Sequence, residues 1–159
     1  MVTAASGVAP ATEADVRAIL AGVMDPELPV VSIADLGMVG LVVVTPAAIQ
    51  VDVLPTFLGC PAIEVILDAV RTSLAPLDVP VVARVSHATP WTSDRISEAG
   101  RHALASAGIA PPTDAPDPAC PWCDSDRTVR DSAFGPTQCR SLHYCRACRQ
   151  PFEAFRTLR

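Results

Sequence analysis

The sequence contains no lysine, and all 12 of its basic residues are arginine. We interpret this as a bias of genomic composition, although guanidinium groups also suit bidentate contacts with carboxylates or phosphates. Only 4% of the residues are aromatic and 18% are charged. The formal net charge of -5 disfavours nucleic acid as the main partner.

Long apolar runs are also lacking. The longest, residues 38–44, is far shorter than the roughly 20 residues that span a bilayer. The first residues do not show the charged and then apolar pattern of a secretory signal. We therefore expect no membrane partner and a cytoplasmic location, where six cysteines serve as ligands or reactive thiols rather than as three disulfides.

Common catalytic motifs are missing as well. The chain has no glycine-rich phosphate loop, no Gly-x-Ser-x-Gly elbow and no His-Glu-x-x-His pair. The common hydrolase and nucleotide-binding signatures are thereby excluded.

The cysteines divide the chain into two unequal parts. Cys60 stands alone in the first 119 residues, and the other five lie in the last 40. Between them, residues 110–118 hold four prolines, which block helix and sheet and favour a stiff connector. We predict a first domain over residues 1–110, a linker over 111–119 and a second domain over 120–159.

The first part alternates between helical and strand patterns. Thr12 with Asp15 forms a capping pair, and Thr92 or Ser93 could cap a later helix that stops at Gly108. The predicted order is helix, strand, strand, helix, strand, helix, over residues 12–23, 38–45, 49–56, 61–74, 79–85 and 92–107. This order predicts an α/β (α+β) fold with a small three-stranded sheet.

Two Cys-x-x-Cys pairs carry the strongest motif. Cys120 with Cys123 and Cys145 with Cys148 enclose 21 residues, enough for a hairpin, and could place four thiolates around one tetrahedral ion. Some 40 residues hold too little core to fold unaided, so the metal would supply much of the stability. We predict a structural zinc ribbon; an iron–sulfur centre and a metal-free tail are the alternatives.

Cys139 is the odd cysteine of the second part. Three interpretations stay open: a small buried apolar residue, an additional metal ligand, or a thiol that acts on something outside the ribbon.

Cys60 stands directly before Pro61, and we expect it at the N-cap of the second helix. Backbone N–H groups and the helix dipole there would lower the pKa of its thiol. The alternative is an inert core cysteine. Asp25 and Glu27 supply two carboxylates on a proline-rich loop, which by itself is a weak signal.

Several of these segments resemble a known family. Asp25-Pro26-Glu27-Leu28-Pro29, residues 32–39, Pro55-Thr56 and Gly59-Cys60-Pro61 are similar to the small domain of iron–sulfur assembly factors. The resemblance implies that Asp25, Glu27, Thr56 and Cys60 bind iron or an Fe–S cluster.

Together with the cysteine-rich segment, nearly all of residues 12–156 resembles the PaaD-like family of the bacterial phenylacetyl-CoA epoxidase system, which acts in aerobic phenylacetate degradation. In this resemblance Cys120, Cys123, Cys145 and Cys148, with Cys139, correspond to the family's C-terminal extension. Pro136 departs from the small polar residue expected there.

The resemblance implies an accessory or maturation factor that is not itself an enzyme. Its implied partners are a di-iron oxygenase and a reductase with flavin and a [2Fe–2S] cluster. Its implied cofactors are structural zinc and a transient iron or Fe–S cluster, completed by a homodimer or a partner protein. The alternatives are a purely structural subunit and a thiol-redox protein that uses Cys60 with Cys139.

Overall fold

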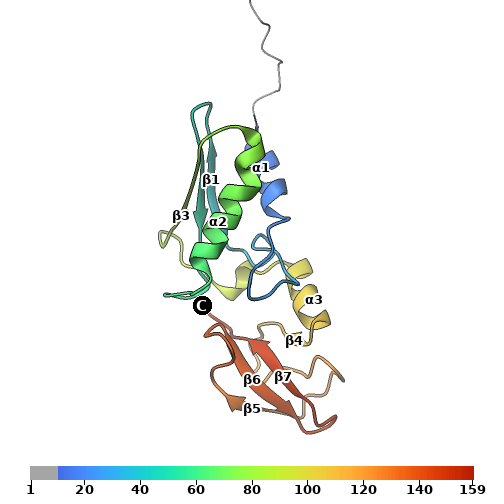
Figure 1. Cartoon of the computed structure of the whole chain (residues 1–159). Helices are drawn as coiled ribbons and strands as arrows, with labels where there is room; N and C mark the ends of the chain where they lie inside the picture. Colours follow the sequence, from blue (N-terminus) through green and yellow to red (C-terminus); the bar gives the residue numbers. More distant parts are fainter. Residues whose placement is uncertain (1–10) are drawn as a thin grey trace, which may run out of the picture.

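A computed structural model describes residues 11–159 (Figure 1). The first ten residues of the expected first domain lie outside this range. None of the described helices is long and apolar enough to cross a membrane. In chain order the elements are α1 (Glu13–Leu20), β1 (Val39–Val44), β2 (Ile49–Val53), α2 (Ile63–Leu74), η1 (Ala75–Leu77), β3 (Val81–Val85), η2 (Ser93–Arg95), α3 (Glu98–Ser106), β4 (Ile109–Ala110), β5 (Thr128–Ser132), β6 (Arg140–Cys145) and β7 (Pro151–Phe155).

The first sheet confirms the predicted three strands. β1 and β2 form an antiparallel hairpin, and β3 joins β2 in parallel after the crossover through α2. Ile49, Val51 and Val53 alternate along β2 and are fully buried on the face that α1 and α2 cover. The other face leaves Leu41, Val43 and Val82 exposed.

The structure confirms the first two predicted helices, although α1 ends earlier and α2 begins later than predicted. The Thr12 side chain accepts the Asp15 N–H while the Asp15 carboxylate accepts the Thr12 N–H, which is the reciprocal capping box that the sequence indicates. The apolar stripe of α2 buries Ile66, Leu67 and Val70 against the sheet.

The predicted third helix is wrong at its start. Ser93–Arg95 form only a 3₁₀ turn, and Ile96 is extended at φ -67° and ψ 122°. Ser97 then caps α3, because its hydroxyl oxygen accepts the Gly100 N–H at 2.9 Å. Asp35 holds Ser97 in place: the Ser97 N–H donates to the Asp35 carbonyl, and the Ser97 hydroxyl donates to the Asp35 carboxylate. Gly108 ends the helix at φ +79°, as predicted.

The second sheet has the strand order β4-β7-β6-β5 and forms the ribbon. Its own buried core is small and consists of Ala110, Cys120, Cys145, Phe152 and Ala154. β4 pairs in parallel with β7 although it precedes the proline-rich segment. The division of the chain at residues 111–119 stays a prediction.

One end of the ribbon packs against the first part of the chain. Phe155, at the end of β7, is 3% exposed and belongs to the larger core, where its ring centroid lies 5.8 Å from that of Trp91. The Ser93 N–H donates to the Leu158 carbonyl at 3.0 Å, and the Leu158 N–H donates to the Ser93 hydroxyl at 2.9 Å.

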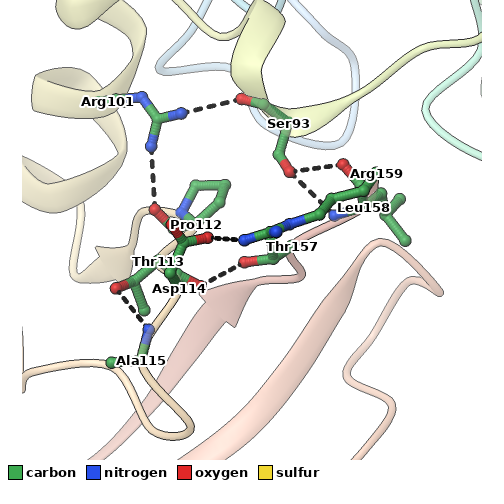
Figure 2. A network of polar contacts seen from close by, with 9 residues as sticks. All are labelled: Ser93, Arg101, Pro112, Thr113, Asp114, Ala115, Thr157, Leu158 and Arg159. Carbon is green, nitrogen blue, oxygen red and sulfur yellow. Dashed lines mark hydrogen bonds and ion pairs between the residues drawn. The ribbon is translucent and has the colours of Figure 1, made fainter.

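Polar contacts extend this junction (Figure 2). The Arg101 guanidinium donates to the carbonyls of Ser93 and Pro112, both at 2.9 Å, and so joins α3 to the connector. The Thr157 hydroxyl donates to the Thr113 carbonyl, and Arg159 pairs with Asp114. The connector and the C-terminal residues are thus fixed to each other and to the first part.

Substituting Phe155 tests this junction. Phe155→Ala should lower the free energy of unfolding by about 3–5 kcal/mol, because it empties a buried aromatic site. Phe134→Ala is the matched control. Phe134 is 57% exposed, and the Arg156 guanidinium lies over its ring at 5.1 Å from the centroid. Its removal should lower the free energy of unfolding by about 1 kcal/mol or less. Urea unfolding of the zinc-loaded protein, followed by tryptophan fluorescence, measures both. Equal costs for the two substitutions would contradict the described packing.

Candidate metal centres

Four cysteines converge on one point at one end of the ribbon, two of them before β5 and two at and just after the end of β6. The sulfur atoms of Cys120, Cys123, Cys145 and Cys148 all lie within 4.8 Å of one another. Cys120 Sγ lies 3.6 Å from Cys148 Sγ, and Cys123 Sγ lies 3.7 Å from Cys145 Sγ. Within residues 11–159 this is the one such group of three or more ligand residues.

Two tight turns bring the thiols together. Asp124 and Arg149, each directly after a Cys-x-x-Cys pair, take left-handed φ values of 56° and 59° that reverse the chain. Backbone N–H groups of Cys148 and Ala147 point at the Cys145 sulfur and lower the pKa of its thiol to about 6, against the opposing effect of burial. The turn backbone therefore favours thiolate at Cys145 before any ion binds.

The spacing of the sulfur atoms fits a single ion. A tetrahedral Zn²⁺ with Zn–S bonds of about 2.3 Å separates its sulfur ligands by about 3.8 Å. A cluster of several irons would spread the thiolates farther, because they are divided among different irons. The four cysteines could therefore hold one zinc ion.

Cys139 does not join this group. Its sulfur lies 3.1 Å from the Thr137 hydroxyl, and the side chain is buried in the larger core of the first part. Burial raises the pKa of its thiol, while Thr137 and the Arg140 guanidinium lower it and Asp25 raises it again.

Cys60 does not occupy the N-cap of the second helix, contrary to the prediction. Helix α2 begins at Ile63, and Ala62 is its N-cap residue. The Ile63 N–H donates to the Cys60 carbonyl at 3.3 Å, so that Cys60–Ile63 form a turn before the helix. The helix therefore begins two residues later than predicted, at Ile63 instead of Pro61.

The electrostatic prediction for Cys60 is also wrong. The pKa of its thiol is raised, first by burial and then by the charges of Glu27, Asp25 and Cys139. One favourable contact, from the Ala62 N–H, opposes them and is outweighed. The surroundings of this half-buried thiol therefore disfavour a free thiolate at Cys60.

Asp25 lies in the loop between α1 and β1. Its Oδ1 accepts the N–H groups of Glu27 and Leu28 at 2.9 and 2.8 Å, which orders the Pro-Glu-Leu turn. Its Oδ2 accepts no hydrogen bond from residues 11–159. Burial raises the pKa of this carboxyl, and the Glu27 and Leu28 N–H groups and the charge of Arg140 lower it.

The structure adds Arg140 to the predicted site residues, because its charge acts on Asp25. It places Thr56 in a different hollow of the surface. The Arg140 guanidinium is buried, pairs with Glu153 at 2.5 Å and donates to the Thr137 hydroxyl at 2.9 Å. The sequence gives no sign that Arg140 acts on Asp25, because the two residues are 115 positions apart and the bonding partners of Arg140, Glu153 and Thr137, both belong to the ribbon. Thr56 lines a separate hollow of about 300 Å³ with His87 and Trp91.

Comparison with known proteins covers both parts of the chain. Residues 13–87 match a family model described as an iron-sulfur cluster assembly protein, and residues 107–156 match one described as the PaaD zinc beta ribbon domain. A curated protein of Escherichia coli (strain K12), named as a putative subunit of 1,2-phenylacetyl-CoA epoxidase, is 35% identical over 159 residues. The match covers 95% of this chain and 96% of that protein.

A solved structure matches the first part alone. The crystal structure of a domain of unknown function, DUF59, from Bacillus anthracis is 30% identical, with a TM-score of 0.54. It covers 58% of this chain and 90% of the other. The α/β fold of the first part is thus confirmed by both kinds of comparison, and the C-terminal zinc ribbon by the family match and the four-cysteine group.

Removal of one thiol tests the four-cysteine centre. Cys123→Ser should lose most of the bound zinc and the dispersed amide NMR signals of the ribbon, because metal binding and folding are coupled in so small a core. Cys139→Ser is the matched control and should keep both, since Cys139 lies outside the group. Zinc content by mass spectrometry of the two variants distinguishes a four-cysteine site from one that includes Cys139.

Proposed function

The chain belongs to the family of the putative 1,2-phenylacetyl-CoA epoxidase subunit of Escherichia coli, and on that premise we propose that it serves such an epoxidase as an accessory factor. In this proposal it helps to assemble or repair the iron or Fe–S centres of its partner subunits. It does not carry out the epoxidation itself. The observation that carries the proposal is the match of residues 13–87, which include Cys60, Asp25 and Glu27, to iron–sulfur cluster assembly proteins.

The ribbon has a structural role in this proposal. Cys120, Cys123, Cys145 and Cys148 hold one zinc ion, whose four ligands leave no open position for substrate. The ribbon then offers a rigid surface to a partner, and its zinc ion serves only to stabilise the fold of the ribbon.

The chemistry at Cys60 suits transfer of iron. A thiol and neighbouring carboxylates are ligands that iron accepts in proteins. Because the thiol is half-buried and its pKa is raised, iron must displace a proton to bind, which weakens the binding and eases release. A weak site is what a carrier needs, since its cargo has to pass to a client.

The same environment disfavours a thiol-redox enzyme. Disulfide exchange needs a thiolate at neutral pH, and both Cys60 and Cys139 have thiols with raised pKa values. A purely structural subunit is the second candidate, favoured by the large share of the chain that packs as one core. It requires no chemistry at Cys60, so substitution of that residue distinguishes the two.

The proposed clients are the di-iron oxygenase and the flavin and [2Fe–2S] reductase of the same system. A homodimer could present two Cys60 thiolates, and a client could supply further ligands. The proposal includes a cytoplasmic location, because the free thiols on which it depends persist in a reducing compartment.

Substitution of Cys60 tests the proposal in cells. When Cys60→Ala is co-expressed with the other epoxidase subunits, the iron content of the purified oxygenase and reductase should fall, while the zinc content and thermal stability of the variant stay unchanged. Val65→Ala, on an exposed position of the following helix, is the control and should load the clients normally. Unchanged client iron with Cys60→Ala, together with stable stoichiometric co-purification, would favour the structural subunit.

A further inference from the structure

The proline-rich connector lies over one face of the ribbon sheet. Ser141 and His143 of β6 point to this face, because alternate residues of a strand share a face, and both side chains are buried. Asp117 of the connector places its Oδ1 3.8 Å from His143 Nδ1. The Thr128 hydroxyl of β5 donates to the carbonyl of Pro118 at 2.8 Å. The connector therefore covers the face on which these polar side chains lie.

Hydrogen bonds fix the connector at both ends of this crossing. Near its start, the Thr113 carbonyl accepts the Thr157 hydroxyl, and Asp114 pairs with Arg159 (Figure 2). Near its end, Pro118 accepts the hydrogen bond from β5. Between these points a hollow of about 350 Å³ remains, which we call the connector hollow. Its walls come from the connector, from the ribbon strands and from the C-terminal residues that follow β7.

The connector hollow has an excess of positive charge. Three arginines line it, Arg130 from β5 and Arg156 and Arg159 from the C-terminal residues, and Asp114 is the one acid among its lining residues. The lining thus has two more positive than negative charges, although the whole chain has a formal net charge of -5. Like charges around one hollow repel each other, and a bound anion relieves that repulsion.

The three guanidinium groups have N–H donors to spare. None of the hydrogen bonds and ion pairs within residues 11–159 uses the guanidinium of Arg130. Arg156 Nη1 donates to the Gln138 carbonyl at 2.9 Å, and Arg159 pairs with Asp114. Because a guanidinium has five N–H donors, these contacts orient the two side chains and leave donors for a ligand.

The wall of the connector hollow also contains an unpaired polar atom. His143 Nδ1 is the one buried side-chain nitrogen or oxygen without a hydrogen-bond partner in the part of the chain that the structure describes. The other ring nitrogen, Nε2, lies 3.0 Å from the Ser141 hydroxyl. At 3.8 Å, Asp117 covers Nδ1 without bonding to it. A ligand that displaces the connector slightly can therefore take this free position.

We propose that the connector hollow binds a small molecule that carries a phosphate monoester. Such a group has a charge of about -2 at neutral pH, which matches the excess of positive charge in the lining. Arginine suits phosphate because its planar fork can donate two parallel hydrogen bonds to two phosphate oxygens. The volume lies within the range of small-molecule sites. It exceeds what a phosphate group fills, so an organic body occupies the remainder.

This site is separate from the one in the proposed function. Cys60 does not line the connector hollow, whereas Ala154 and the docking residue Phe155 do. A ligand in the hollow contacts the connector, the ribbon and the C-terminal residues together. Because a ligand stabilises the arrangement that binds it, occupation of the hollow strengthens the docking of the ribbon.

Isothermal titration calorimetry of the full-length, zinc-loaded protein tests the site. Adenosine monophosphate is the phosphate monoester, and adenosine is the matched ligand without the phosphate. The wild type should bind the first and not the second. Arg130→Gln should weaken the binding of adenosine monophosphate by about tenfold or more, because it removes a charge-assisted contact with the phosphate.

Arg127→Gln is the matched control variant. It removes the same charge from an exposed position of the ribbon that does not line the connector hollow. At physiological salt, where distant charges are screened, it should change the affinity by about twofold or less.

The other outcomes would overturn the inference. Equal weakening in the two variants would show attraction to the overall charge of the ribbon instead of binding in the hollow. No binding of adenosine monophosphate or of inorganic phosphate at millimolar concentration would contradict an anion site. Equally tight binding of succinate, a dicarboxylate, would contradict the preference for phosphate, and equally tight binding of inorganic phosphate would contradict the organic body. None of these results affects client iron loading through Cys60, so the accessory role is tested separately.

Discussion

Four thiolates at one end of the ribbon hold together a sheet whose own apolar core has five members, two of which are the metal-site cysteines Cys120 and Cys145. Such a core cannot offset the conformational entropy of some 40 residues. Metal coordination at one end and docking at the other therefore both stabilise the ribbon. Phe155, Cys139 and Leu158 fix the docked end in the larger core, so that the position of the ribbon follows from the same packing that stabilises it.

This arrangement links the ribbon to the core of the first part. The zinc site shapes the hairpin, the hairpin carries the loop before β6, and that loop places Cys139 in the larger core. Arg140 adds a buried positive charge to the side where Asp25 lies.

The local features could be predicted from sequence and the long-range ones could not. The Thr12 and Asp15 cap, the stripe of α2 and the two cysteine turns follow from residue types a few positions apart. The predicted start of α2 is wrong because Pro61 is a good first helical residue, yet residues 60–63 form a separate turn and Ala62 becomes the N-cap. The predicted third helix begins too early because the sequence does not reveal that Ser97 is hydrogen-bonded to Asp35, which is 62 positions away. The contact of Cys139 with the first core depends on docking of the whole ribbon, for which a pattern within the ribbon gives no signal.

A crystal structure of the protein loaded with iron under anaerobic conditions would test the account most directly, with anomalous scattering recorded at the zinc and iron edges. The account predicts zinc among Cys120, Cys123, Cys145 and Cys148, and iron bound at Cys60 in the first part. Iron among the four ribbon cysteines, or no iron at Cys60, would contradict it.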